Sequence, residues 1–214
     1  ELPEVDRVVK IKNHLNEEKL FTINVDYYEN KEHYYIFSLT DITEIKEKSN
    51  LLEYHASHDK LTGLFNKNKF EEFYIKEIKR AKRYENDLSI ILFDLDNFKK
   101  INEIQGYQIG DNILKEISQI MSHCIREQDI SARNEGAEFL ILLPQTSLEG
   151  AQSVARKLQT TVFDYLFTEK QIKITASFGV TELYENDNDK TILSRVYKLL
   201  FEAKATGKNK VIAK

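Results

Sequence analysis

The segment that most constrains the fold is a strongly apolar run at residues 88–95, which reads LSIILFDL and predicts a strand. Two further strands are predicted at 129–134 and 138–143, and the tight connection at 135–137 predicts that they form a β-hairpin. Because a hairpin joins antiparallel strands, the sheet that contains it cannot be purely parallel. The sequence therefore predicts a mixed sheet.

Helical segments alternate with these strands and complete an α+β domain. Pro144 ends the second hairpin strand, because proline has no backbone N–H to donate to a sheet. The remaining predicted elements are helices at 66–84, 109–125, 147–165 and 189–205, and strands near 172–183 and at 210–213.

The N-terminal 41 residues predict a separate small sheet. Partial period-2 alternation predicts strands at 8–12, 20–25 and 34–39, with a polar turn at 29–32 before the third strand. A three-stranded meander is short for an independent domain, so we expect this segment to be part of a larger one.

A connector helix is predicted from residue 42 to about residue 57, and Asp41 or Thr43 can cap its N-terminus. Its apolar and small positions are spaced 3, 4, 3 and 4 residues apart, which is the pattern of a coiled-coil seam. Such a short seam is marginal by itself, but it favours a parallel homodimer through this helix. The seam positions are Ile42, Ile45, Ser49, Leu52 and Ala56.

The composition bounds the class of protein. Hydrophobic residues make up 41% and charged residues 31%, which is an ordinary globular balance, and the net charge of -4 argues against nucleic acid as a partner. The single cysteine, Cys124, excludes an internal disulfide and is expected to be a buried apolar residue. With no signal peptide and no apolar run of about 20 residues, we expect a cytoplasmic protein. The first residue is Glu1 rather than methionine, so the chain is also consistent with the cytosolic end of a longer, membrane-anchored protein.

Five motifs occur in order along residues 59–214. They read DKLTGLFN at 59–66, FDLDNFKKIN at 93–102, GYQIGD at 106–111, RNEGAEF at 133–139 and AKATGKN at 203–209. They resemble the DxLTGLxN, FDxDxFKxIN, GHxxGD, RxGG[DE]EF and AKxxGRN motifs of the GGDEF family of diguanylate cyclases. The resemblance implies a ferredoxin-like palm similar to that of nucleotide cyclases, with a mixed, mainly antiparallel sheet flanked by helices.

A fainter resemblance covers the N-terminal segment. Strands that end in LTDIT at 39–43 resemble the last strands of a PAS sensor domain, which commonly precede a signalling helix. The expected organisation is a partial PAS-like segment at 1–41, a connector helix at 42–58 and a degenerate GGDEF domain at 59–214.

The resemblance assigns metal and nucleotide roles to individual residues. Asp94 and the backbone carbonyl of Leu95 match metal ligands, and Asn102 and Asp111 match the residues that contact the guanine edge. An acid at a strand end and polar residues near helix ends also occur for structural reasons, as turn or cap residues. Asp94 and Asp96 are two apart on a strand, so both are expected on one face of the sheet.

Two basic residues match the phosphate-binding part of the family site. Lys204 matches a triphosphate-binding lysine, and Lys208 stands where the family has arginine, which keeps the charge but loses the bidentate fork. We expect Mg²⁺ or Mn²⁺ as a cofactor only if GTP is bound.

The signature motif itself departs from the family pattern. Its third position, which in the family supplies a second metal carboxylate and the general base, is Ala137, and a methyl group can neither ligate a cation nor accept a proton. Its first position is Glu135 where the family has glycine. Glu138 is retained, and Glu135 is a candidate substitute for the missing acid. We therefore expect a catalytically weak or inactive domain.

A second candidate site precedes the hairpin. Arg126 and Asp129 form an RxxD sequence at the offset of the family's inhibitory site, which binds cyclic-di-GMP through arginine and carboxylate contacts. Lys157, or the neighbouring Arg156, is a candidate for a further basic contact. An RxxD sequence alone is also common as a surface ion pair.

Three hypotheses follow. The first is a non-enzymatic cyclic-di-GMP receptor that uses the RxxD site. The second is an active diguanylate cyclase, converting two GTP to cyclic-di-GMP and two pyrophosphates, with an altered turn. The third is a scaffold that keeps the fold and its partner contacts but binds no nucleotide.

Overall fold

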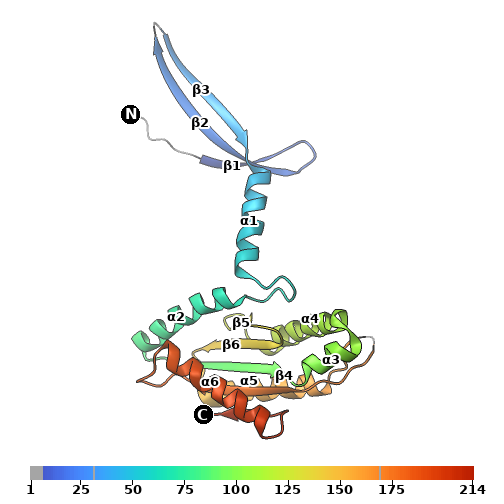
Figure 1. Cartoon of the computed structure of the whole chain (residues 1–214). Helices are drawn as coiled ribbons and strands as arrows, with labels where there is room; N and C mark the ends of the chain where they lie inside the picture. Colours follow the sequence, from blue (N-terminus) through green and yellow to red (C-terminus); the bar gives the residue numbers. More distant parts are fainter. Residues whose placement is uncertain (1–6, 31, 169) are drawn as a thin grey trace. The chain divides into compact units, whose positions relative to one another are not determined.

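The structure is a computed structural model that describes residues 7–30, 32–168 and 170–214. It divides into a smaller unit that ends at Ala56 and a larger unit that begins at Ser57. Figure 1 labels the helices and strands of both units.

The smaller unit is an antiparallel sheet followed by a helix. Strands β1 (Arg7–Lys12), β2 (Glu18–Asn30) and β3 (Glu32–Asp41) pair in the order β1-β2-β3, and α1 (Thr43–Ser57) follows. Of the predicted turn, residue 31 lies outside the described residues. The carboxylate of Asp41 accepts a hydrogen bond of 3.0 Å from the backbone N–H of Thr43, the first residue of α1.

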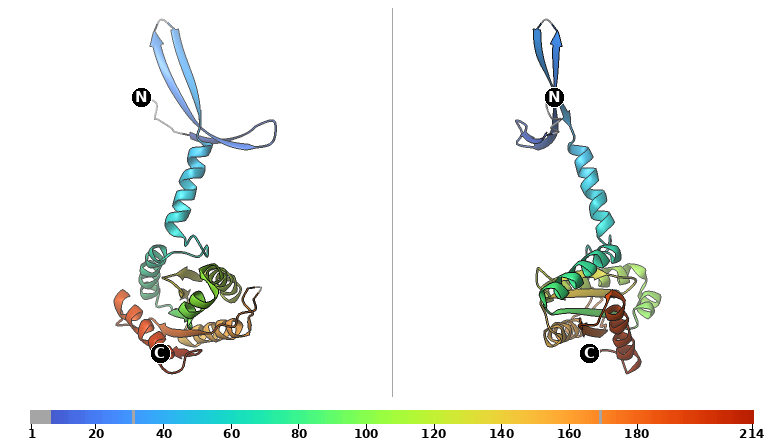
Figure 2. Two further views of the ribbon diagram at one scale, coloured as in Figure 1. Left: turned by 45° about the vertical axis from the view of Figure 1, so that its right-hand side comes forward. Right: turned by 90° about the vertical axis from the view of Figure 1, so that its left-hand side faces the viewer.

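The larger unit contains the predicted hairpin and the predicted helices. Its elements, shown from further directions in Figure 2, are α2 (Lys67–Tyr84), β4 (Leu88–Leu95), α3 (Phe98–Gln105), α4 (Tyr107–Cys124), β5 (Ile130–Arg133), β6 (Glu138–Pro144), α5 (Leu148–Asp164), β7 (Ala176–Glu182), α6 (Asp189–Ala205) and β8 (Val211–Ala213).

The sheet of the larger unit is mixed and mainly antiparallel, which confirms the predicted fold class. Its strand order is β5-β6-β4-β7-β8. Strand β4 pairs antiparallel with both β6 and β7, β5 pairs antiparallel with β6, and β7 with β8 is a parallel pair. The apolar strand β4 therefore lies at the centre of the sheet, where both of its faces are covered.

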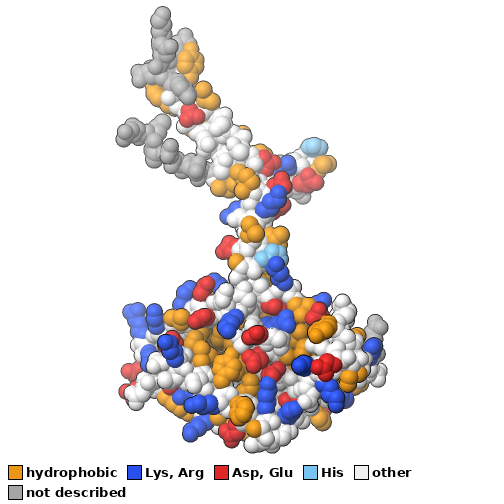
Figure 3. All heavy atoms as spheres, viewed as in Figure 1, with side chains coloured by type: hydrophobic (Ala, Val, Ile, Leu, Met, Phe, Trp, Pro, Cys, Tyr) orange, Lys and Arg blue, Asp and Glu red, His pale blue; other side chains and the backbone are white. Residues whose placement is uncertain are grey.

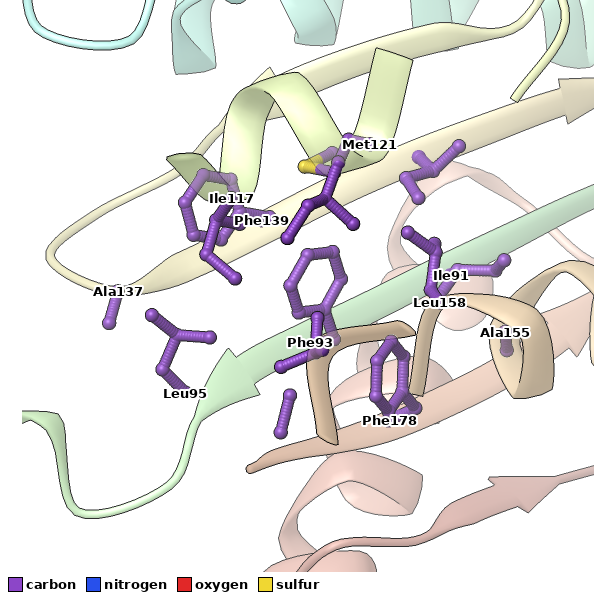
Figure 4. Close-up of a cluster of buried hydrophobic side chains, with 14 of the residues drawn as sticks. Ile91, Phe93, Leu95, Ile117, Met121, Ala137, Phe139, Ala155, Leu158 and Phe178 are labelled. Carbon is purple, nitrogen blue, oxygen red and sulfur yellow. The ribbon is translucent and has the colours of Figure 1, made fainter. Parts of the chain in front are cut away.

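Two apolar clusters cover the two faces of β4, because successive side chains of a strand point to opposite sides. Ile91, Phe93 and Leu95 pack with helices α4 and α5 in the cluster drawn in Figure 4. Ile90 and Leu92 pack with helices α2 and α6 in the second cluster. By this alternation, Asp94 belongs to the face that α2 and α6 cover.

Close packing at one glycine sets the position of α6 over the sheet. A Cβ atom on Gly179 of β7 would lie 2.4 Å from the carbonyl oxygen of Val196 and 2.6 Å from the backbone nitrogen of Leu200. No side chain fits there without moving the helix, so α6 rests directly on β7. This close approach carries Lys204, near the end of α6, to the end of β4.

Two local features differ from the sequence predictions. Residues 98–105 form a helix of their own, α3, which was not predicted and which Gly106 separates from α4. The strand predicted from residue 172 begins only at Ala176, because residue 172 pairs instead with Phe167 across a tight loop. Gln171 in that loop has a φ of 53°, which is incompatible with a continuing strand.

Among the described residues, the smaller unit exposes many apolar side chains, and the surface of the larger unit carries charges of both signs. Lysine and arginine are interspersed with acids over the visible face of the larger unit in Figure 3. Several side chains of β2 and β3 are exposed, among them Phe37 at 68%. No helix among the described residues is long and apolar enough to cross a membrane.

Candidate functional site

The end of strand β4 places an acidic side chain beside the lysine of α6. Asp94 lies opposite Glu138 of β6 on one side and Ser177 of β7 on the other. The carboxylate of Asp94 forms an ion pair with the ammonium group of Lys204, and these side chains are 16% and 34% exposed. The negative charge of Asp94 is therefore balanced within the protein.

Asp96, just beyond the end of β4, links neighbouring segments of the fold through hydrogen bonds. Its buried carboxylate accepts hydrogen bonds from the Thr175 hydroxyl at 2.6 Å, the Ser177 hydroxyl at 2.7 Å and the backbone N–H of Asn209 at 3.0 Å. These bonds join the loop after β4 to β7 and to the segment before β8. A carboxylate that already accepts three hydrogen bonds from the protein stabilises the fold and is not free to bind a ligand.

The signature turn between β5 and β6 is fixed by an arginine. Gly136 has a φ of 56°, a conformation that favours glycine. The guanidinium of Arg133 donates to the carbonyl oxygen of Gly136 at 2.9 Å through Nε and at 2.8 Å through Nη2. Through Nη1 it also reaches Asp59 Oδ1, at 3.1 Å. The turn is thus tied to the opening motif, 74 residues earlier in the chain.

Asp59 is held in its charged form. Burial acts to raise its pKa, but the hydrogen bonds from Thr62 and from Arg133 outweigh burial and lower the pKa of Asp59 below its usual value. The Thr62 hydroxyl donates to Asp59 Oδ1 at 2.7 Å and the Thr62 backbone N–H at 2.9 Å. The opposite charges of Asp59 and Arg133 therefore stabilise the geometry of the turn.

The position of the missing acid is apolar and buried. Ala137 is 8% exposed and belongs to the cluster of Figure 4, which shows it beside Leu95. The backbone carbonyl of Ala137 accepts a 3.4 Å hydrogen bond from the Leu95 N–H. The turn is therefore well ordered against β4, but its side chain offers no oxygen or nitrogen there.

The two neighbouring glutamates do not fill this gap. Glu135 is exposed. Glu138 accepts a 2.9 Å hydrogen bond from the side-chain amide of Asn134, which also donates to the Tyr197 hydroxyl at 2.8 Å. Burial, together with the charge of Glu138, raises the pKa of Tyr197 above its usual value.

A pocket of about 520 Å³ opens at this end of the sheet and gathers most of the predicted residues. Asp111, Glu135 and Glu138, although described, are not part of its lining. Its lining comprises Asp94, Leu95, Asp96, Asn97, Phe98, Lys99, Asn102, Tyr107, Gly136, Ala137, Lys204 and Lys208.

A buried polar side chain lies at the corner between α3 and α4. The side-chain oxygen Oδ1 of Asn102 is buried and has no hydrogen-bond donor among the described residues. A Cβ atom on Gly110 would lie 1.8 Å from this oxygen, so glycine is required for α4 to pass so close to α3. Nearby, the ammonium of Lys208 donates to Asn97 Oδ1 at 2.5 Å.

Sequence reasoning did not assign a site role to five residues of the lining, which are Asn97, Phe98, Lys99, Tyr107 and Gly136. Asn97 and Lys99 lie inside the FDLDNFKKIN motif and Tyr107 inside GYQIGD. Their position within the matched motifs was the signal that could have identified them. Roles were assigned only to the acidic and amide residues of these two motifs and to the Leu95 carbonyl.

The residues present do not fit a two-carboxylate magnesium site. Mg²⁺ takes hard oxygen ligands in near-octahedral geometry. Asp94 is paired with Lys204, Asp96 is saturated by three donors, and Ala137 contributes nothing. Within the described ranges, no group of three or more His, Cys, Asp or Glu side chains is placed to hold a metal ion.

The RxxD residues lie in the turn after α4. The backbone N–H of Arg126 donates to Asp129 Oδ2 at 2.8 Å, and the Asp129 N–H donates to the Arg126 carbonyl at 3.1 Å. The Arg126 side chain is exposed, and Asp129 Oδ1 is buried without a hydrogen-bond donor among the described residues. Burial raises the pKa of Asp129 above its usual value, although the Arg126 hydrogen bond and charge oppose this.

The following helix brings a lysine to the same turn. Lys157 of α5 donates to the carbonyl of His123, three residues before Arg126, at 3.4 Å. Arg156, its neighbour on α5, is exposed. Cys124, predicted to be buried, is half-buried at the end of α4.

The fold and the ordered motifs define a nucleotide-cyclase type of palm, and comparison with known proteins gives the family. The profile described as "Diguanylate cyclase, GGDEF domain" matches residues 56–210. The chain belongs to the GGDEF domain family.

Individual relatives agree with this assignment. Diguanylate cyclase DgcM of Escherichia coli K12 is 34% identical over 175 residues, which cover 81% of this chain and 42% of DgcM. The chain thus spans less than half the length of that relative. The GGEEF domain of an active diguanylate cyclase from Vibrio cholerae is 31% identical with a TM-score of 0.67, covering 69% of this chain and 96% of that domain.

A further solved structure shares the fold at lower identity. The coiled coil and GGDEF domain of DgcB from Caulobacter crescentus, in complex with c-di-GMP, has a TM-score of 0.77 at 21% identity. The match covers 81% of this chain and 93% of that one.

The Arg133–Asp59 pair gives the first testable prediction. In a double-mutant cycle of Arg133→Ala and Asp59→Ala, we expect a coupling of about 1–3 kcal/mol in the free energy of unfolding at neutral pH. Because the pKa of Asp59 is lowered in the folded state, this coupling is present above the unfolded pKa and is lost as the pH falls through the folded pKa.

The exposed pair Arg80–Glu77 is the matched control. Its ions are 3.5 Å apart and Arg80 is 59% exposed, so we expect a coupling below about 0.5 kcal/mol. Urea denaturation measures both cycles, and an Arg133–Asp59 coupling no larger than the control contradicts the clamp.

Proposed function

We propose that this chain is a cyclic-di-GMP signalling module whose GGDEF domain has very weak or no cyclase activity and binds cyclic-di-GMP at the RxxD turn. The observation that carries the loss of activity is the position of Ala137, a buried methyl group in the turn that lines the same pocket as Asp94. The observation that supports binding is the RxxD turn, with an exposed Arg126 and a buried, unpartnered Asp129 Oδ1.

The proposed loss of activity rests on the lack of a carboxylate that could act as the general base at the signature turn. Joining two GTP molecules requires a base to take the proton of the attacking hydroxyl, and general-base assistance contributes roughly 10²–10⁴ in rate. Asp94 is neutralised by Lys204, Glu138 accepts from Asn134, and Glu135 is exposed outside the pocket lining. None of these carboxylates stands where Ala137 does.

The second prediction concerns turnover. With GTP and Mg²⁺ or Mn²⁺, we expect little or no cyclic-di-GMP from the wild-type chain, measured by chromatography of the products. The double change Glu135→Gly with Ala137→Asp rebuilds the family motif and is expected to raise turnover by about 10² or more. Glu135→Gly alone is the control and should stay silent, because it restores the backbone position but not the acid.

Turnover by the wild type comparable to that of active relatives contradicts the proposal. If Glu135→Gln then abolished that turnover, Glu135 would be the substitute acid and the active-cyclase hypothesis would stand.

Cyclic-di-GMP presents guanine edges and phosphates, which match the groups at the RxxD turn. A guanidinium can donate two parallel hydrogen bonds to guanine or phosphate, and a carboxylate oxygen can accept from guanine N–H groups. Lys157 adds a second positive charge from α5. The raised pKa of Asp129 fits a carboxylate that gains from a new donor.

The third prediction concerns this site. By calorimetry, we expect the wild-type chain to bind cyclic-di-GMP and Arg126→Ala to weaken binding at least tenfold, since a hydrogen bond to a charged group contributes about 1.5–3 kcal/mol. Arg83→Ala, an exposed arginine on α2, is the matched control and should bind as the wild type does. No heat of binding by the wild type would remove the receptor and leave the scaffold hypothesis.

We also propose that the smaller unit is the end of a PAS-like domain and that α1 pairs in a homodimer. Helix α1 buries no residue within the chain, and the seam residues Ile45 and Leu52 are 67% and 70% exposed. A helix that leaves its apolar seam uncovered is stabilised by pairing with a second copy.

The fourth prediction tests this pairing by light scattering over a range of concentrations. We expect a dimer that Leu52→Glu dissociates and that Leu51→Glu preserves, because Leu51 is equally apolar but lies off the seam. A wild-type chain that stays monomeric throughout, or equal effects of the two substitutions, contradicts pairing through this seam.

A further inference from the structure

A groove of about 670 Å³ runs along helix α6 and shares no lining residue with the pocket at the end of β4. Its members on α6 recur at intervals of three or four residues, so they form one stripe along the helix. From Lys190 to Glu202 this stripe is about 18 Å long, because an α-helix rises roughly 1.5 Å per residue. The lining of this α6 groove comprises Lys190, Thr191, Ser194, Arg195, Lys198, Leu199, Glu202 and Lys214.

The α6 groove carries an excess of positive charge. Four of its lining side chains are cationic, and Glu202 is the acid among them. The guanidinium of Arg195 is already paired with Asp187, to whose Oδ1 it donates at 2.9 Å through Nη1. The three lysines of the lining form no ion pair within the part of the chain that the structure describes. Three unpaired ammonium groups beside one carboxylate favour an anionic ligand.

The edge strand β8 lies beside this groove. It packs against α6, and among the described strands it pairs with β7 alone. The carbonyl of Lys210 accepts a hydrogen bond from β7 at 2.9 Å, and the N–H of Lys214 donates one to β7 at 3.1 Å. Because such bonds alternate along a strand of a parallel pair, the N–H and C=O groups of Val211 and Ala213 point to the open side of β8.

The side chains along β8 alternate between the two faces of the sheet. Val211 and Ala213 pack against the cluster that α4 and α5 cover. Lys214 lies on the other face by this alternation, which agrees with its place in the lining of the α6 groove. A strand added to the open edge would therefore place every second side chain beside the α6 groove.

We propose that an extended acidic segment of a partner protein pairs with the open edge of β8 and places its acidic side chains in the α6 groove. Alternate residues of a strand are about 7 Å apart, so three alternate acids span about 14 Å. Lys190 and Lys198 are about 12 Å apart along α6, so the first and third acids match these two lysines. The intervening side chains lie beside Val211 and Ala213 and are therefore expected to be apolar.

The open edge and the positive charge together select this class of partner. A second copy of the chain is disfavoured at this edge, because it would bring its own Lys210 and Lys214 against the same charges. A polyphosphate matches the charge of the groove but has no backbone N–H and C=O groups for β8. An acidic peptide provides both, and peptides commonly bind to exposed sheet edges in this way.

The experiment measures the binding of a synthetic peptide to the 214-residue chain by fluorescence anisotropy. The labelled peptide has nine residues, with glutamate at every second position and valine between. We expect saturable binding that weakens as salt is added, because added ions screen exposed charges. A peptide of the same composition with its glutamates grouped in one half should bind at least about tenfold more weakly, since it cannot present them on one face. Absence of saturable binding up to about 1 mM overturns the proposal.

Methylated peptides test the pairing with the backbone of β8. One peptide carries N-methyl groups on the glutamates and the other carries them on the valines. Because only one of these two sets of N–H groups points at β8, only one of the peptides should lose binding, by about tenfold or more. Equal binding of the two peptides contradicts strand pairing and indicates a charge contact of any polyanion.

Substitutions in the chain locate the surface. Lys198→Glu should weaken binding of the alternating peptide at least about tenfold, because it reverses one charge of the groove. Lys79→Glu, which makes the same change at an exposed lysine of α2, is the matched control and should bind as the wild type does. The proposal is overturned if these two variants bind the peptide equally.

A proline at the edge tests the role of β8 itself. Ala213→Pro removes an N–H group that points to the open side, and the bonds of β8 to β7 do not use that group. This variant should lose peptide binding at least about tenfold while its thermal unfolding stays cooperative. Unchanged binding by a folded Ala213→Pro contradicts pairing at this edge, and Lys198→Glu tests the groove independently if the proline variant does not fold.

Discussion

The arrangement of this site depends on the bonds that the Arg133 side chain makes to two partners. One guanidinium holds the carbonyl of Gly136 and the carboxylate of Asp59, so the hairpin turn, β5 and the segment before α2 are joined at a single point. Asp96 makes a comparable junction from the other side, where it joins the end of β4 to β7 and to the segment before β8. The signature turn lies between these two junctions. Ala137 therefore places a methyl group in a turn whose backbone is held by Arg133.

The consequence of Ala137 is local and electrostatic. The methyl group joins the apolar cluster with Leu95, and the remaining acid, Asp94, is paired with Lys204. On our account, this site therefore lacks the second carboxylate that the family uses to hold a divalent metal. The RxxD turn lies on a different part of the domain, at the end of α4, and its hydrogen bonds among the described residues do not involve the signature turn. The proposed loss of catalysis is therefore compatible with the proposed binding of cyclic-di-GMP at the RxxD turn.

Much of the fold could be predicted from sequence because its signals are local. Neighbouring residues alone determine the apolar run of β4, the hairpin around Gly136 and the periodic spacing of apolar residues in the helices. The prediction of a mixed sheet followed from the hairpin. The heptad spacing in α1 was likewise visible, and α1 buries none of its residues within the chain. Helix α3 was missed because its short segment, 98–105, reads as a motif and carries too few residues for a periodic signal.

The sequence predicted most of the residues that form the site, but it did not predict the contacts between them. Asp94 and Lys204 are 110 residues apart, and no local pattern indicates that they form an ion pair. Asp111 was grouped with Asn102 from the motifs, yet only Asn102 lines the pocket. Such pairings arise from close packing, as where Gly179 lets α6 rest on β7, and packing of this kind depends on residues far apart in sequence.

The most direct test of the central claim is whether a divalent ion binds at Asp94. Electron paramagnetic resonance of Mn²⁺ titrated with the nucleotide-free chain distinguishes free from protein-bound ion, and an active relative with an intact motif is the positive control. We predict the spectrum of free Mn²⁺ at every protein concentration, unchanged by Asp94→Asn. Stoichiometric binding of Mn²⁺ that Asp94→Asn abolishes would contradict the account, because it would mean that the metal displaces Lys204 and needs no acid at position 137.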